Sequence, residues 1–152
     1  MNLTKILEQK SIKVGFDSSD KEAIIKELVD LLETNGLLNN CAEVLESVLI
    51  REKTRSTGIG SGIAIPHGKC CSVKELIMAI GISTEPIEFE SVDGKGVSIV
   101  LLFLSPSDQT GPHIQALASI SRLMLDEEFR MSLVNAGSAE QVYELISKKE
   151  TS

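Results

Sequence analysis

Aromatic residues and long basic stretches are both scarce in this chain of 152 residues. Tryptophan is absent and aromatic residues make up only 3% of the sequence, which leaves no visible platform for stacking nucleic-acid bases. Asp and Glu outnumber Lys and Arg by 22 to 15, the formal net charge is -7, and the longest basic cluster is the Lys148-Lys149 pair. This composition argues against binding to nucleic acid or to an anionic membrane surface, because both require concentrated positive charge.

Long apolar runs and cysteines suited to disulfides are lacking as well. No run of about 18 uncharged apolar residues occurs, and the N-terminal segment MNLTKILEQKSIKVGF has no apolar core of the kind that a signal peptide needs. Cys41, Cys70 and Cys71 are an odd number of cysteines, and two adjacent cysteines are poor partners for each other. We therefore expect a soluble, cytoplasmic protein with reduced thiols.

Hydrophobic residues, by contrast, are plentiful. They make up 42% of the sequence, enough for a core built from aliphatic side chains, so we expect a single domain over residues 1–152. The first clear element is an amphipathic helix. Ser19 and Glu22 form a capping-box pattern ahead of it, and Gly36 supplies its C-terminal stop.

A second amphipathic helix is predicted to begin at Asn40, with Glu43 as its capping-box partner. Its apolar stripe continues to the segment REKT, so Arg51 and Glu52 lie in its last turn. The glycines of the following segment, TGIGSG, then end regular structure.

Three buried strands are predicted in the middle of the chain. Ile63–Ile65 forms a short one that a proline ends, and His67 follows directly. Leu76–Ser83 and Val97–Ser105 are nearly continuous apolar runs, typical of strands buried on both faces. Asp93-Gly94 is a turn signal between them, so we expect a hairpin-like connection.

Three further helices are predicted in the C-terminal third. Gly111-Pro112 suits a helix start and places His113 in the first turn, while Asp126 and Ser138 have the character of N-caps. The order of elements predicts an α/β fold, a mixed parallel and antiparallel sheet flanked by helices on both faces. The expected apolar face of the first of these helices consists of Ile114, Leu117, Ala118, Ser121 and Leu125.

Familiar catalytic motifs do not fit the segment TGIGSGIAIPHGKC. A dinucleotide fingerprint fails at its third glycine, and a P-loop would need glycine at Ile63 and serine or threonine at Cys70. Ser61 is not placed as a nucleophile elbow. Zinc could in principle be bound by His67, Cys70 and Cys71, but the side chains of adjacent cysteines point apart, so we expect no metal. We interpret both cysteines as small buried or loop residues.

The same segment does suit a histidine that accepts a phosphoryl group. A glycine segment is often only a turn, and a single histidine at a strand end is more often structural than reactive. Here, however, His67 follows a proline, and we expect the glycines to leave backbone amides open to an anion. The hydroxyls of Ser56 and Thr57 add donors nearby, and Arg51 offers a positive charge. Neutral imidazole is nucleophilic near pH 7, and phosphoryl transfer depends mainly on positioning and charge stabilisation. The helix start at His113 is a further source of donors.

Three segments of the chain resemble the fructose, mannitol and nitrogen-regulatory type of enzyme IIA of the bacterial phosphoenolpyruvate-dependent phosphotransferase system. These segments are REKTRSTGIGSGIAIPHGK, DGKGVSIVLLFLSPSDQTGPHIQALASISRLM and SAEQVYELI, and the resemblance covers essentially the whole chain. It implies that His67 is the phosphorylated histidine and His113 the second active-site histidine, with Arg51 and Thr57 stabilising the phosphoryl group. It also implies the phosphocarrier protein HPr as donor, and no cofactor.

Two roles are consistent with this resemblance. The protein is either a regulatory switch of the nitrogen-regulatory branch, whose phosphorylation state selects its target protein, or a sugar-transport enzyme IIA of the fructose or mannitol type that passes the group to a IIB component. The segments REKTRSTGIGSGIAIPHGK and SDQTG resemble the nitrogen-regulatory branch, and we expect no fused IIB or membrane segment. We therefore expect the regulatory role.

Overall fold

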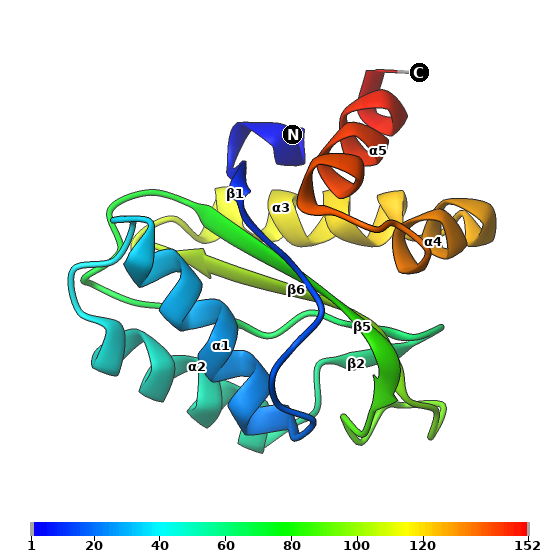
Figure 1. The fold of residues 1–152 in the computed structure, drawn as a ribbon. Coiled ribbons are helices and arrows are strands. Elements are labelled where there is room, and N and C mark those ends of the chain that lie inside the picture. Colours follow the sequence, from blue (N-terminus) through cyan, green and yellow to red (C-terminus); the bar gives the residue numbers. More distant parts are fainter. Residues whose placement is uncertain (1, 152) are drawn as a thin grey trace.

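Six strands form one mixed sheet, and helices pack on both of its faces (Figure 1). The computed structural model describes residues 2–151. In chain order, the elements are the 3-10 helix η1 (Leu3–Lys5), β1 (Leu7–Val14), α1 (Lys21–Thr34), α2 (Cys41–Thr54), β2 (Gly58–Gly60), β3 (Ile63–Ala64), β4 (His67–Lys69), β5 (Ile77–Ile87), β6 (Val97–Ser105), α3 (Thr110–Leu123), α4 (Glu127–Val134) and α5 (Ala139–Thr151).

The sheet has the strand order β1-β5-β6-β3-β2, and β4 also pairs with β6. β1 is parallel to β5, and β6 is parallel to both β3 and β4, whereas the pairs β5–β6 and β2–β3 are antiparallel. The predicted mixed sheet and the hairpin-like connection between the two long strands are therefore confirmed. In that connection, the amide of Gly94 donates to the carbonyl of Ser91 at 3.0 Å, within the predicted turn.

β6 lies at the centre of the sheet because almost all of its side chains are apolar and buried. Successive strand residues point to opposite faces, so Leu101 and Phe103 join one core while Leu102 and Leu104 join the other. α3, α4 and α5 cover the first core, and α1 and α2 cover the second (Figure 1). The prediction of helices on both faces is confirmed.

The observed N-caps of the helices agree with the predicted ones except at the first helix. The first helix is capped by Asp20, whose carboxylate accepts from the amide of Ala23 at 3.2 Å, so the prediction of Ser19 as its cap is wrong by one residue. Asn40 caps α2 as predicted, accepting from the amide of Glu43 at 3.1 Å. Asp126 and Ser138 also accept from the amides of the turns that follow them.

α3 differs from its prediction in start and in orientation. It begins at Thr110, one residue before Gly111-Pro112. Its predicted apolar face is wrong, since Ile114 and Leu125 are 60% and 79% exposed. The buried side chains are those of His113, Ala116, Ser119, Ile120 and Leu123, so the helix turns its histidine inward.

The glycine segment is more regular than predicted. Gly58–Gly60 forms the edge strand β2, which turns through Ser61 and Gly62 and pairs with β3. Both turn residues have positive φ, 58° for Ser61 and 80° for Gly62. His67 also differs, because it begins the separate strand β4 instead of following the end of β3.

Among residues 2–151, no helix combines the length and the apolar character needed to cross a bilayer.

Candidate functional site

His67 is held in place by the sheet and by a hydrogen bond to its own chain. β4 pairs His67 with Phe103 of β6, and the Nδ1 atom of His67 lies 2.8 Å from the carbonyl oxygen of Ile65. Because a carbonyl oxygen can only accept, Nδ1 carries the proton and Nε2 keeps its lone pair. The side chain is half-buried, and burial lowers its pKa below the ordinary value of 6.5, as do the charges of Arg51 and Lys69. Nε2 of a neutral His67 is therefore nucleophilic at neutral pH.

His113 lies beside His67 although 46 positions separate them in the sequence. The ring centroids are 5.5 Å apart, with the ring planes at 62°. His113 is only 6% exposed, its ring packs against that of Phe103 at 4.9 Å, and its Nδ1 atom lies 2.5 Å from the hydroxyl of Ser105. Burial, then the charges of His67 and Lys69, lower the pKa of His113 to about 4, so this imidazole is also neutral at neutral pH. The structure thus brings the two predicted histidines together.

Two cations act on this pair of imidazoles. Arg51, in the last turn of α2, lowers the pKa of His67, and one of its terminal nitrogens donates to the carbonyl of Arg55 at 2.9 Å. Lys69 lies two residues after His67 in β4, and its ammonium donates to the hydroxyl of Thr110 at 3.4 Å, which bridges β4 to the start of α3. The lowered pKa values of both histidines reflect its charge. An anion bound at the histidines would therefore experience positive charge from both residues.

Thr57 makes its contacts with Glu52. The Thr57 amide and hydroxyl donate to the two carboxylate oxygens of Glu52 at 2.9 and 2.5 Å. Glu52 is 5% exposed, and its charge is balanced by the ammonium of Lys21 at 2.8 Å. The hydroxyl proton of Thr57 is therefore used inside the protein, and direct donation to a phosphoryl oxygen would require this bond to break. Buried carboxylates need such donors, which is the physical reason for the arrangement.

The amides expected to be open for an anion are partly occupied too. The amide of Gly58 donates to the hydroxyl of Ser56 at 3.0 Å, and the amide of Ser61 donates to the carboxylate of Asp93 at 3.1 Å. The hydroxyl of Ser56 in turn donates to the carbonyl of Phe89. The prediction that the glycine amides of this segment are open to an anion is wrong at Gly58, because the hydroxyl of Ser56 accepts from that amide.

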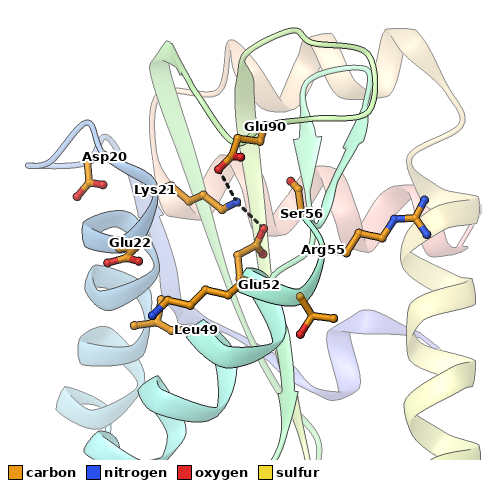
Figure 2. Close-up of a pocket in the computed structure, with 10 residues that line it drawn as sticks. Asp20, Lys21, Glu22, Leu49, Glu52, Arg55, Ser56 and Glu90 are labelled. Atoms are coloured by element: carbon orange, nitrogen blue, oxygen red, sulfur yellow. Dashed lines mark ion pairs between the residues drawn. The ribbon is translucent and has the colours of Figure 1, made fainter.

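A cavity of about 610 Å³ lies beside Glu52, which is one of its lining residues (Figure 2). Lys21 reaches across it from the start of α1 toward Glu52 and Glu90, at 2.8 and 3.8 Å. Charges of both signs face this cavity, and of the residues that the structure describes, neither histidine lines it. The cavity is therefore lined by the Lys21–Glu52 ion pair and is separate from the histidine site. Its lining residues are Asp20, Lys21, Glu22, Leu49, Glu52, Lys53, Thr54, Arg55, Ser56 and Glu90.

Sequence reasoning assigned no role to Ser105, Lys69 or Glu52. A signal was present for Glu52, because it continues the buried stripe of Val44 and Val48 at intervals of four residues. Ser105 is the polar end of a buried apolar run, and Lys69 lies on the same face of its strand as His67. Their partners lie on other elements, so only the folded chain reveals what they contact.

Comparison with known proteins supports a single family. A sequence model described as "Phosphoenolpyruvate-dependent sugar phosphotransferase system, EIIA 2" matches residues 5–149. The chain is 35% identical over 150 residues to the fructose-specific EIIABC component of Bacillus subtilis. The matched region is 99% of this chain but only 24% of that longer protein. It is 32% identical over 151 residues to the nitrogen regulatory protein of Klebsiella oxytoca, covering 97% of this chain and 91% of that protein.

A solved structure agrees with these relatives. The nitrogen regulatory protein IIA-Ntr of Neisseria meningitidis superposes with a TM-score of 0.87 at 34% sequence identity, over 93% of this chain and 97% of that one. The two structures therefore share the mixed sheet and the helices on both of its faces. The chain therefore belongs to the EIIA 2 family of the phosphoenolpyruvate-dependent sugar phosphotransferase system.

Proposed function

We propose that this protein is a phosphoryl carrier that accepts a phosphoryl group on Nε2 of His67 from the phosphohistidine of HPr. The observation that carries the proposal is the 2.8 Å hydrogen bond from Nδ1 of His67 to the Ile65 carbonyl, in a neutral imidazole placed 5.5 Å from a second histidine. It orients the ring and leaves one nitrogen with a free lone pair. Membership of the EIIA 2 family supports the choice of phosphoryl chemistry.

The transfer balances without a further reactant. The lone pair of Nε2 of His67 attacks the phosphorus of the donor, the new P–N bond forms, and the electron pair of the broken P–N bond returns to the donor imidazole. The ring of His67 becomes more positive as the bond forms. Its Nδ1 proton already donates to the Ile65 carbonyl, which stabilises that charge without rearrangement.

The surrounding residues compensate the negative charge that arrives. Arg51 and Lys69 supply positive charge beside His67, and both already act on its pKa. His113 supplies a neutral ring beside His67, with ring centroids 5.5 Å apart, and its Nε2 atom is the one that we expect to contact a phosphoryl oxygen. Thr57 contributes through its bonds to Glu52, which hold the segment between α2 and β2 in place.

The first role that we propose for the phosphorylated protein is regulatory, in nitrogen or related metabolism. Relatives named nitrogen regulatory proteins match this chain over 91% and 97% of their own lengths at 32% and 34% identity. Phosphorylation adds about -1.5 to -2 charge at one surface site and so changes which protein surface can dock there. The target protein binds at the surface around His67 and His113 in one phosphorylation state and is released in the other.

A sugar-transport role is the second candidate. The fructose-specific relative from Bacillus subtilis, at 35% identity, favours it. In this role, a IIB component takes the phosphoryl group from His67 and passes it to the sugar. The site chemistry is the same in both cases, so the acceptor distinguishes them.

Phosphorylation is tested by incubating the protein with phosphoenolpyruvate, enzyme I and HPr and recording its intact mass, with HPr omitted as control. We expect the gain of one acid-labile phosphoryl group, full loss of this gain in His67→Ala, and a slower or less stable product in His113→Ala. Circular dichroism checks that both variants fold. Equal, full labelling of His67→Ala would refute the assignment of the acceptor.

The acceptor is tested by mixing the phosphorylated protein with a purified IIB protein of the fructose type. Rapid loss of the label to that protein would establish the transport role and overturn the regulatory one. Retention of the label, with binding of a target protein that depends on phosphorylation, would establish the regulatory role.

A further inference from the structure

Ser105, the last residue of β6, places its hydroxyl within hydrogen-bond distance of Nδ1 of His113. The residue is 0% exposed, and its backbone is engaged, since it pairs with Lys69 and its carbonyl accepts from the amide of Cys70 at 3.0 Å. Within residues 2–151, the one hydrogen-bond partner of the Ser105 hydroxyl is Nδ1 of His113 at 2.5 Å. A buried hydroxyl needs an acceptor for its proton, so the arrangement that satisfies Ser105 is donation to this nitrogen.

The direction of that bond decides where His113 carries its own proton. A neutral imidazole has one N–H, and if Nδ1 accepts from Ser105, the proton is on Nε2. The reverse bond, with Nδ1 as donor, would leave the buried hydroxyl proton of Ser105 without an acceptor. Burial and neighbouring positive charge keep the ring neutral, because they lower the pKa of His113 to about 4.

The two histidines then have opposite tautomers. In His67, Nδ1 donates to the Ile65 carbonyl and Nε2 offers a lone pair, whereas in His113, Nδ1 accepts and Nε2 offers a proton. With ring centroids 5.5 Å apart, one imidazole is a nucleophile and its neighbour a hydrogen-bond donor. A hydrogen-bond donor beside the nucleophile can stabilise the negative charge on a phosphoryl oxygen.

We propose that Ser105 is a positioning residue, which holds His113 in the Nε2–H tautomer so that this N–H donates to the phosphoryl group on His67. The second half of this inference rests on the proposed function, whereas the first half concerns the resting protein. Ser105 itself does not touch the phosphoryl group. It acts through the proton that it places on the neighbouring ring.

The tautomers are measured by NMR of the full chain with nitrogen-15 in its histidines, at neutral pH. The chain has 2 histidines, so each ring is assigned from one substitution. We expect protonated Nε2 and bare Nδ1 in His113, and the reverse in His67. In Ser105→Ala, His113 should become a mixture of tautomers, and Ser105→Thr, which keeps the hydroxyl, should restore the single form.

Ser83→Ala is the matched control, since Ser83 is a buried serine at another strand whose hydroxyl donates to the carbonyl of Glu85. It should leave the spectrum of both histidines unchanged. A protonated Nδ1 in His113 of the natural chain, or a spectrum of His113 unaltered in Ser105→Ala, would overturn the inference.

The functional half is measured by the rate at which the phosphorylated protein forms and hydrolyses. A mixture of tautomers leaves only part of His113 able to donate, so Ser105→Ala should slow transfer or hasten hydrolysis by the inverse of that fraction, about twofold for an even mixture, with Ser105→Thr and Ser83→Ala near the natural rates. Unchanged rates despite a shifted tautomer would refute the link to the phosphoryl group. If the natural chain takes up no phosphoryl group at all, the proposed function fails, whereas the spectrum still decides the tautomer.

Discussion

At the scale of single residues, the same side chain acquires different properties from its contacts. His67 and His113 are both held neutral mainly by burial, yet one Nδ1 atom faces a carbonyl and the other a hydroxyl. Burial disfavours the charged ring, and nearby Lys69 opposes it further. The contact of one ring nitrogen therefore sets the chemistry of the other.

The pKa of His113 predicts how stability depends on pH. Its ring stays neutral in the folded state down to about pH 4, whereas in the unfolded chain it binds a proton below about pH 6.5. The unfolded state therefore binds more protons between these values, and the free energy of unfolding falls as the pH is lowered through this window. Urea unfolding at several pH values should show a smaller fall for His113→Gln, which cannot titrate. An NMR titration of His113 with a midpoint near 6.5 would contradict this prediction.

At the scale of elements, the ends of the helices connect the fold to the site. Asp20 caps α1, the next residue Lys21 reaches Glu52 at the end of α2, and Glu52 holds Thr57. The start of α3 is joined to β4 by the bond between Lys69 and Thr110. The site therefore depends on where each helix begins and ends.

The cap of α1 gives a test with a built-in control. Asp20→Ala removes the acceptor for the amide of Ala23, and we expect the free energy of unfolding to drop by about 1 kcal/mol. In a domain of this size, that corresponds to a fall in Tm of about 2–4 °C. Ser19→Ala should change the free energy of unfolding by less than about 0.5 kcal/mol, since the structure gives Ser19 no capping role. A larger loss in Ser19→Ala than in Asp20→Ala would show that Ser19 is the cap after all.

At the scale of the whole molecule, one sheet separates two apolar cores. β5 and β6 contribute side chains to both cores, so the two cores share these strands. Cooperative unfolding of both faces follows from this shared sheet. The histidine site lies where β4, β6 and α3 meet, and so depends on the same cooperative unit.

Two neighbouring leucines test this cooperativity. Leu101 and Leu102 are both 0% exposed and face opposite cores, so each change to alanine should lower the free energy of unfolding by about 2–5 kcal/mol. Tyr143, the single tyrosine, packs against the core of Leu101 and reports on that side alone. We expect Leu102→Ala to shift the Tyr143 fluorescence transition and the circular-dichroism transition together. Separate transitions in the two signals would indicate that the cores unfold independently.

Most of the elements could be predicted from sequence because their signals are local. The apolar run of β6 and the caps at Asn40 and Asp126 depend on residues close in the chain. The inward face of α3 could not be predicted in this way, because His113 and Ser119 occupy positions that an apolar pattern assigns to solvent. His113 contacts Phe103 and Ser105, which come from another element.

The sequence by itself determined the mixed α/β architecture, the net charge of -7, and His67 and His113 as the residues to examine. These conclusions rest on periodicity, charge and local motif, which need no knowledge of long-range contacts. Only the tertiary structure decided which nitrogen of each imidazole is engaged, that Thr57 is bound by Glu52, and that Ser105 is the partner of His113. Hydrogen-bond direction depends on which polar groups meet in a buried space, and that meeting is a property of the packed chain.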